Sequence, residues 1–252
     1  MAWRDHPLCA PTATYPDRFW GPERMDSDAF VELVDLLSPD AELAAITAAL
    51  DGVTDVVDIG GGTGLITQAT ARIAPVRVIE PDPEQRAHLP PGITVQDGRA
   101  EHLPVADHGT DAAVITWVMQ YCDDPLQAIR ELVRVARRRV VIVQAAPAND
   151  LVTIYNTEAA IAGDRPAHHG WLLANAAEAL EAAGFTVELA PLAIPLKAPK
   201  SAAALADTLA RMHFRGHAKL REMIAATLPF IEERLASGGL SDDGAMLVAR
   251  RD

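Results

Sequence analysis

The chain has 252 residues, of which 49% are hydrophobic and 23% are charged, and its formal net charge is −13 at pH 7. This length and composition are typical of one globular domain, alone or with a small cap. The negative charge argues against a nucleic-acid partner, because phosphates are bound by basic surfaces. Only two cysteines, Cys9 and Cys122, are present, which is too few for a disulfide framework and favours a reducing cytoplasm.

Two further absences in the sequence narrow the expected location. No apolar run approaches the roughly 18 residues of a membrane-spanning helix. Residues 1–7 lack the apolar stretch of a signal peptide. We therefore expect a cytoplasmic protein with no membrane partner. The one basic run, Arg137-Arg138-Arg139, falls between an expected helix and an expected strand, and we interpret it as a solvated helix end.

The first elements expected along the chain are helices. Residues 1–25 are rich in proline and aromatic residues and look irregular. A helix with Ser27 as its cap should follow, and a second should start at Ser38-Pro39. The expected helices up to residue 190 are 28–37, 39–50, 64–74, 83–89, 125–137 and 171–183. The expected strands are 54–59, 76–80, 93–96, 111–117, 139–145, 185–190 and 245–250.

A helical insertion separates the last two expected strands. Residues 201–213 begin at the candidate cap Ser201, and residues 216–236 continue the pattern, although Pro229 should kink or split that stretch. The alternation of strands and helices before the insertion predicts a doubly wound parallel sheet. Ligands of such sheets bind at the carboxyl ends of the strands. The loops expected there are 60–64, 80–82, 97–104, 117–124, 146–170 and 191–200.

The most informative segment is Val56-Val57-Asp58-Ile59-Gly60-Gly61-Gly62-Thr63-Gly64. A short β-branched run leads into a loop of glycines, and a helical pattern follows at once, which indicates a strand, a tight turn and a helix. Such a turn exposes its backbone to a ligand, and the helix N-terminus offers free N–H groups. Glu80, at the end of the next strand, could bind both hydroxyls of a ribose. The glycine spacing differs from the G-x-G-x-x-G of dinucleotide enzymes.

Several segments together resemble the class I S-adenosylmethionine-dependent methyltransferases, in particular the small-molecule enzymes of the UbiE or type-11 kind. The glycine loop resembles their first motif, and Glu80-Pro81-Asp82 resembles the acidic position that holds the ribose. Residues 98–104 resemble the G-D-A-E-x-L-P segment beside the adenine. Residues 111–125 resemble the fourth strand with the start of its helix, and residues 131–135 resemble an E-x-x-R-V helix end. The resemblance covers roughly residues 40–190.

The resemblance implies a Rossmann-like sheet of seven strands, mostly parallel with an antiparallel last strand, and S-adenosylmethionine as the cofactor with S-adenosylhomocysteine as its product. It further implies an arm at 1–40 that could form a lid, a cofactor-binding core at 41–200, a helical cap at 201–237 and a final strand at 238–252. The implied cofactor-binding residues are Tyr15, Asp58, Gly60, Gly61, Gly62, Thr63, Gly64, Glu80, Pro81, Arg99, Ala100, Glu101 and Trp117.

One departure from the family pattern concerns the adenine. Many relatives have an aspartate where this chain has Arg99, and an arginine has no acceptor for the adenine amino group. The nearby Asp97 could take that hydrogen bond, the guanidinium could stack on the purine, or the register could differ.

Methyl transfer requires mainly that donor and acceptor be aligned, so a general base is optional. His168 and His169 are candidate bases, because they precede a helix that should begin at the ligand edge of the sheet. Tyr121 could contact the acceptor, and core packing is its alternative role. His213 and His217 flank the break between the inserted helices and could face the acceptor pocket, although a surface position is the preferred interpretation. No metal site is expected, because two adjacent histidines chelate poorly.

We therefore expect transfer of a methyl group from S-adenosylmethionine to an oxygen or nitrogen atom of a small-molecule acceptor. The alanine- and proline-rich composition suggests a GC-rich bacterial source and hence specialised, antibiotic-type metabolism. The alternatives are a non-methylation reaction such as a cyclisation, carbon methylation, and a nicotinamide-dependent oxidoreductase. The oligomeric state stays open, a homodimer included.

Overall fold

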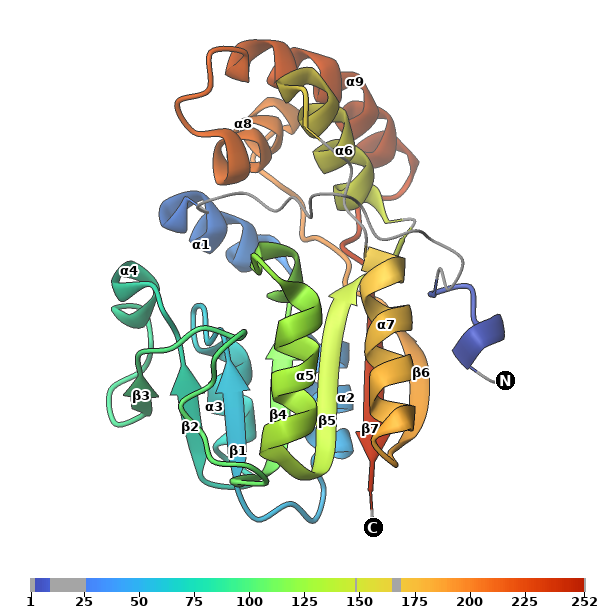
Figure 1. Ribbon diagram of the computed structural model, residues 1–252. Coiled ribbons are helices and arrows are strands. Elements are labelled where there is room, and N and C mark those ends of the chain that lie inside the picture. The colour runs from blue at the N-terminus through green and yellow to red at the C-terminus, as the bar shows by residue number, and fades with distance from the viewer. Residues whose placement is uncertain (1–2, 10–25, 148, 165–168, 252) are drawn as a thin grey trace.

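The protein is described by a computed structural model that covers residues 3–9, 26–147, 149–164 and 169–251 (Figure 1). Its strands form one sheet in the order β3-β2-β1-β4-β5-β7-β6. The strands are β1 (Val56–Ile59), β2 (Val76–Ile79), β3 (Thr94–Gln96), β4 (Thr110–Thr116), β5 (Ala136–Ala145), β6 (Thr186–Leu192) and β7 (Gly244–Arg250).

The sheet is parallel except for its last strand. β1 pairs in parallel with both β2 and β4, and β4 pairs in parallel with β5. β7 is antiparallel to both of its neighbours, β5 and β6. The expected Rossmann-like, doubly wound sheet with an antiparallel last strand is confirmed. Its strand order reverses between β1 and β4, which is where ligands bind in this class of fold.

Helices cover both faces of the sheet and its carboxyl edge. In Figure 1, α5 and α7 lie in front of the strands, and α2 and α3 lie behind them. No described helix is long and apolar enough to cross a bilayer. The helices are α1 (Ser27–Leu36), α2 (Asp40–Ala49), α3 (Leu65–Thr70), α4 (Pro83–Arg86), α5 (Pro125–Val135), α6 (Asp150–Ala162), α7 (His169–Ala182), α8 (Ala202–Phe214) and α9 (Leu220–Ser237), with single turns η1 (Trp3–Asp5) and η2 (Met119–Tyr121).

Alternate residues of the strands build two separate cores. In β1, Val57 and Ile59 pack with α5 and α7, whereas Val56 packs with α2. β5 repeats the pattern, since Ile142 belongs to the first cluster and Val143 to the second. This alternation follows from the two-residue period of a strand. It also explains why the strands read as nearly continuous apolar runs.

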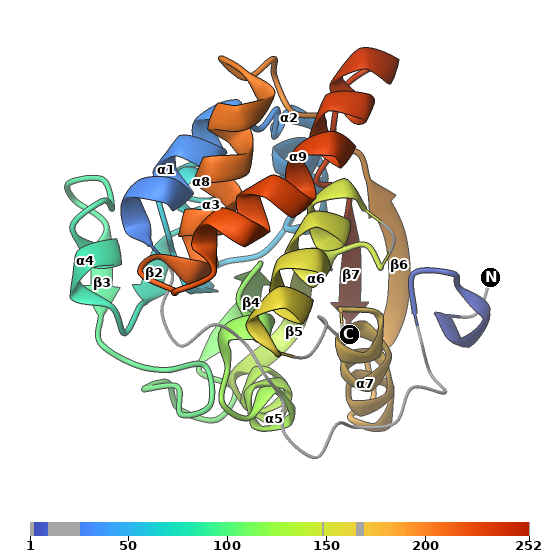
Figure 2. The ribbon, with the colours of Figure 1, turned by 90° about the horizontal axis from the view of Figure 1, so that it is seen from above.

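Above the carboxyl edge, α6, α8 and α9 pack together with α1 (Figures 1 and 2). From here on, we use the name cap for α6, α8 and α9 together, so that it includes α6 as well as the two inserted helices. Their shared apolar cluster includes Leu33 of α1, Ile154 of α6 and Ile231 of α9. Two ion pairs tie α1 to the cap, from Glu32 to Arg211 at 2.7 Å and from Asp26 to Arg215 at 2.6 Å. The helices that cover the carboxyl edge of the sheet therefore come from segments far apart in the chain.

The structure corrects the expectation of a loop over 146–170, because α6 lies there. The side chain of Asn149 caps it by accepting a hydrogen bond from the backbone N–H of Val152 at 2.6 Å. Pro229 does not split the second inserted helix, since α9 runs through it as one helix. Ser201 does cap α8, as expected, by accepting from Ala204 N at 3.1 Å.

Two further expectations are wrong. Asp26, and not Ser27, caps α1, because its carboxylate accepts from Ala29 N at 2.9 Å. The basic run 137–139 does not end a helix. It lies at the start of β5. There Arg137 forms an ion pair at 2.9 Å with the carboxylate of Asp55, at the amino edge of the sheet. Helices α3 and α4 are also shorter than the patterns predicted.

Candidate functional site

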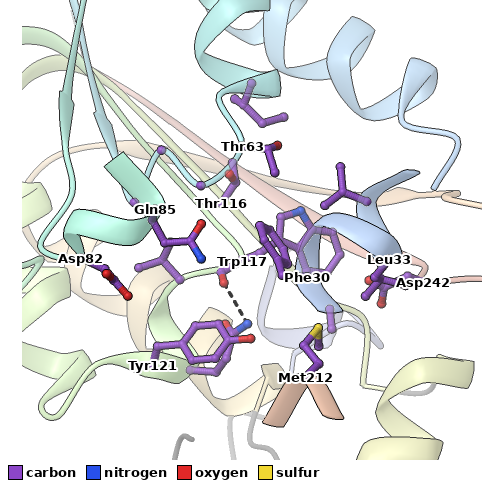
Figure 3. A pocket seen from close by; sticks show the side chains of 18 of the residues that line it. Phe30, Leu33, Thr63, Asp82, Gln85, Thr116, Trp117, Tyr121, Met212 and Asp242 are labelled. Atoms are coloured by element: carbon purple, nitrogen blue, oxygen red, sulfur yellow. Dashed lines mark hydrogen bonds between the residues drawn. The ribbon is translucent and has the colours of Figure 1, made fainter. Parts of the chain in front are cut away.

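A cavity of about 540 Å³ lies between the carboxyl edge of the sheet and the cap (Figure 3). One side, which we call the strand half, is formed by residues that follow β1, β2, β3 and β4. The other side, which we call the cap half, is formed by α1, α2, α6, α8 and Asp242. Figure 3 shows Asp82 and Gln85 at one end of the cavity and Asp242 and Met212 at the other.

The glycine loop gives the strand half a wall of bare backbone. Gly60 has φ +76°, and a Cβ added there would lie 2.3 Å from the side chain of Val118. Gly62 has φ +51°, a conformation that β-branched residues strongly disfavour. Gly60, Gly61, Gly62 and Thr63 all line the cavity. A ligand there meets main-chain atoms at the start of α3, where N–H groups are free of helical partners.

Asp58 and Gly64, both predicted to bind the cofactor, are not among the residues that line the cavity. Asp58 is only 1% exposed, and its Oδ2 accepts a hydrogen bond from Thr67 Oγ1 at 2.5 Å. Burial raises the pKa of Asp58 to about 6. Asp58 thus connects β1 to α3 beneath the loop. Gly64 is the N-cap of α3, with φ +78° and no room for a Cβ beside Pro90.

Glu80 stands at the end of β2 and is 6% exposed. Its Oε1 accepts from Asp82 N at 2.9 Å, and the carboxylate also accepts from the backbone of Gly62. Burial is the largest influence on this carboxyl and raises its pKa. Glu80 lines the cavity beside Pro81 and Asp82. The backbone hydrogen bonds fix an acceptor group that faces the glycine loop.

Arg99, Ala100 and Glu101 line the cavity next to Glu80. Arg99 donates to Asp123 at 2.8 Å and lies 3.5 Å from Glu101. The neighbouring Asp97 is not the substitute acceptor that the sequence suggested, because its side chain is 79% exposed and pairs with Arg86 at 2.9 Å. Among the described residues of this wall, Glu101 is the carboxylate beside Arg99.

The loop that carries these residues is held by the E-x-x-R-V end of α5. Glu131 accepts from Leu103 N at 2.7 Å. Arg134 donates to the carbonyl oxygens of Val105 at 2.7 Å and Leu103 at 3.1 Å. These charge-assisted bonds connect a helix end outside the cavity to the loop that forms part of its wall.

Trp117 turns the chain at the end of β4 with φ +60°, which is unusual for a bulky residue. Its indole N–H donates to Glu42 at 2.6 Å, and both residues line the cavity. The hydrogen bond joins the two halves, since Glu42 belongs to α2. Burial raises the pKa of Glu42 despite this bond.

Among the described residues, the histidine that lines the cavity is His213 of α8, for which the sequence favoured a surface position over one facing the acceptor pocket. Its Nε2 lies 3.1 Å from the hydroxyl of Tyr121, and its ring packs edge-on against Tyr155 at 4.4 Å. Burial raises the pKa of Tyr121 well above its ordinary value, so the phenol keeps its proton. A sequence signal for His213 existed, because it follows the apolar stripe of Leu205, Leu209 and Met212 that faces inward.

Other predicted residues cannot be compared with the cavity in the same way. Tyr15 and His168 lie outside the described residues. His169 is the first residue of α7, and its side chain lies outside the described part of the chain. His217 is described and is not among the residues that line the cavity.

Comparison with known proteins identifies the core. Residues 57–143, which run from β1 to β5 and include the glycine loop, match the model of the methyltransferase domain family. Residues 57–143 therefore belong to the methyltransferase domain family. Enzymes of this family use S-adenosylmethionine as their methyl donor.

Curated relatives of this methyltransferase domain support the assignment. An uncharacterized methyltransferase of Mycobacteroides abscessus is 32% identical over 131 residues, which are 48% of each chain. A chloroplastic 2-methyl-6-phytyl-1,4-hydroquinone methyltransferase 2 of Oryza sativa subsp. japonica is 34% identical over 90 residues, 32% of this chain and 26% of that protein. The chain therefore spans about half or less of the length of these relatives.

Solved structures show the fold of the methyltransferase domain over most of the chain. The YcgJ protein of Bacillus subtilis superposes with a TM-score of 0.55 and 16% identity, over 83% of this chain and 98% of that one. The [4+2]-cyclase SpnF does so with 0.51 and 21%, over 84% and 80%. A phosphoethanolamine N-methyltransferase 2 of Haemonchus contortus, solved with S-adenosylmethionine, gives 0.52 and 12%, over 83% and 52%.

The residues of the strand half fit S-adenosylmethionine. The glycine wall leaves space that a Cβ would fill, which suits the close approach of a ligand. The Glu80 carboxylate, anchored by backbone N–H groups, presents to the cavity the kind of acceptor that ribose hydroxyls require.

Proposed function

We propose that this chain transfers a methyl group from S-adenosylmethionine to an oxygen or nitrogen atom of a small-molecule acceptor bound in the cap half. The observation that carries the proposal is one continuous cavity whose strand half fits the cofactor and whose cap half offers an apolar wall with a few polar groups. Such a lining is typical of small-molecule sites. The cofactor, when bound, supplies an electrophilic methyl carbon on a positively charged sulfur.

The cofactor would be held mainly by residues that the strands position. Glu80 would accept hydrogen bonds from the ribose, and Glu101 is the proposed acceptor for the adenine amino group in place of the missing aspartate. Gly60, Gly62 and Trp117 would contact the methionine part. Holding donor and acceptor in line is worth on the order of 7–11 kcal/mol at best, so alignment can account for most of the catalysis.

We propose His213 as the base when the acceptor must lose a proton. It lines the cavity, and its 3.1 Å contact with Tyr121 holds the imidazole in one orientation. An imidazole is suited to accept a proton near neutral pH. His168 and His169 remain predictions that the same kinetic assay can test. The arm at 1–40, the core at 41–200, the insertion at 201–237 and the final strand at 238–252 are proposed as the functional units, with the first and third covering the site.

A cyclisation is the second candidate, because the [4+2]-cyclase SpnF has the same fold at 21% identity. In that case the cofactor or its product would be bound without transfer. Bacterial specialised metabolism is proposed as the setting, on the basis of composition alone. Carbon methylation would be recognised from the product, since a new carbon–carbon bond resists the hydrolysis that cleaves an ester.

Calorimetry with S-adenosylhomocysteine, followed by an assay with donor labelled in its methyl group, tests the proposal. We expect binding in the micromolar range, about −8 kcal/mol, and label in a small-molecule product. Binding without label transfer would favour the cyclisation. Absence of S-adenosylhomocysteine binding would overturn both.

A further inference from the structure

The cap half of the cavity is acidic as well as apolar. Glu42 enters from α2, Glu158 from α6 and Asp242 from the loop before β7. Among the lining residues that the structure describes, Arg99 is the lone lysine or arginine, and it lies in the strand half, already paired with Asp123 and Glu101. The cap half thus contains three carboxyl groups from three segments. Its described lining residues include no lysine or arginine.

Glu158 differs from the other two in its hydrogen bonding. Glu42 accepts from the Trp117 indole, and Asp242 accepts from Asn149 Nδ2 at 2.9 Å. Glu158 is 1% exposed, and its Oε1 has no hydrogen-bond partner among the described residues. A buried carboxyl oxygen without a donor is costly, by about 1–3 kcal/mol or more. Such an atom in a cavity wall indicates that a ligand supplies the donor.

The acidic cluster lies away from the groups that fit the cofactor's ribose and adenine. In Figure 3, Asp242 is at the end of the cavity opposite Asp82 and Gln85. Glu158 is one helical turn from Tyr155, which also lines the cavity and packs against His213. A cation beside Glu158 would therefore also meet an aromatic ring, a favourable pairing.

We propose that the acceptor carries a protonated amine that binds in the cap half, with Glu158 as its principal partner and Asp242 as a second negative group. This inference rests on the proposed function and names the chemical class of its acceptor. An ammonium supplies a positive charge to both carboxyl groups and the N–H donor that Glu158 Oε1 lacks, whereas an alcohol supplies one donor and no charge. A carboxylate in the same place would be repelled. The apolar residues Leu33, Leu209 and Met212 would contact the rest of the molecule.

Burial raises the pKa of Glu158 to about 8 and that of Asp242 to about 7. A bound ammonium would favour the ionised form of both groups and so release protons on binding. This adds a second observable to the affinity itself, because the heat of amine binding should depend on the ionisation enthalpy of the buffer.

The test uses the full chain loaded with S-adenosylhomocysteine and pairs of probes that share a scaffold. The pairs are 2-phenylethylamine with 2-phenylethanol, tryptamine with tryptophol, and hexylamine with hexanol, together with 3-phenylpropanoate as the acid. We expect at least one amine to bind about tenfold more tightly than its alcohol, and the acid to bind more weakly than either.

The variant Glu158→Gln keeps the shape of the side chain and should reduce the amine preference to less than about threefold. Glu232→Gln, which removes an exposed carboxylate of α9, is the matched control and should retain the preference. Circular dichroism and thermal unfolding check that both variants fold.

Three results would overturn the inference. They are the absence of any amine preference in the panel, a preference unchanged in Glu158→Gln, and a loss of S-adenosylhomocysteine affinity in that variant, which would assign the carboxylate to the cofactor. The wild-type affinity for S-adenosylhomocysteine is measured first. If the unmodified chain does not bind it, the proposed function fails, whereas normal binding without amine preference refutes this inference alone.

Discussion

The two halves of the cavity are built in different ways. The strand half consists of glycine backbone and of carboxylates fixed by backbone N–H groups at the ends of neighbouring strands. The cap half consists of side chains from four helices and a loop, which reach the cavity from widely separated parts of the chain. Backbone geometry can be conserved on a rigid sheet, whereas side chains on packed helices can be exchanged. We therefore expect the strand half to bind the cofactor and the cap half to select the acceptor.

The largest effect is expected from adding a side chain to the glycine loop, which tests whether the strand half binds the cofactor through its backbone. We expect Gly62→Val to weaken S-adenosylhomocysteine binding by more than about 100-fold, or about 2.7 kcal/mol, by calorimetry. The reason is that Gly62 combines a positive φ with a place in the cavity wall. Gly163→Val is the control, because Gly163 has φ +88° at the end of α6 and open space around its Cβ position. Equal loss in both variants would mean that strain alone is responsible.

A change in the cap half should affect turnover and spare the cofactor. We expect His213→Gln to lower kcat by about 100-fold if the acceptor must lose a proton, which is within the range for a general base. Its S-adenosylhomocysteine affinity should stay within about threefold of the wild type. His217→Gln is the control, since that residue is close in sequence but does not line the cavity. Wild-type turnover in His213→Gln would leave alignment as the source of catalysis.

The buried carboxyl group of Glu158 should also make the stability of the folded protein depend on pH. The pKa of Glu158 is about 8 in the folded protein and near 4.5 ordinarily, so between those values the folded state holds a proton that the unfolded chain has lost. Stability therefore falls as pH rises through that window, by up to about 1.4 kcal/mol for each unit of pKa difference. Glu158→Gln removes this loss. Its melting temperature should match the wild type at pH 5 and exceed it above pH 8, and a constant difference would contradict the assignment.

The smallest expected effect concerns the cap alone. Ser201→Ala removes the hydrogen bond to Ala204 N that caps α8 and should lower the free energy of unfolding by about 1 kcal/mol. Denaturant titration measures this change. Cofactor affinity should not change, because the cofactor is expected to bind the strand half. A large loss of affinity would show that the two halves are more strongly coupled than their construction suggests.

The sequence predicts the strand half of the cavity better than the cap half. The glycine loop and Glu80 were predicted because each is a short local pattern that follows a strand. Arg134 was predicted as part of a motif, but its contacts to the loop of Leu103 needed the structure. The sequence offers Asp97 as a substitute acceptor for the adenine amino group, but its carboxylate pairs with Arg86, which lies on another segment.

The cap half was poorly predicted for a physical reason. Glu158 lies on α6, where the sequence predicts a loop, and Asp242 lies in the segment between α9 and β7, where the sequence shows no motif. Neither residue carries a local sequence signal, because its role depends on the cavity wall that distant segments of the chain form together. His213 follows the apolar stripe of α8, but the sequence does not show whether that stripe packs against a closed core or borders a cavity.

The inserted helices join the sheet at a single place. The chain leaves the sheet after Leu192 and returns at Gly244, and these two residues are register partners at the ends of β6 and β7. The whole segment from 193 to 243 therefore starts and finishes at adjacent points of one antiparallel ladder. We therefore expect that this segment can be replaced as a unit without disturbing the strand pairing beneath it.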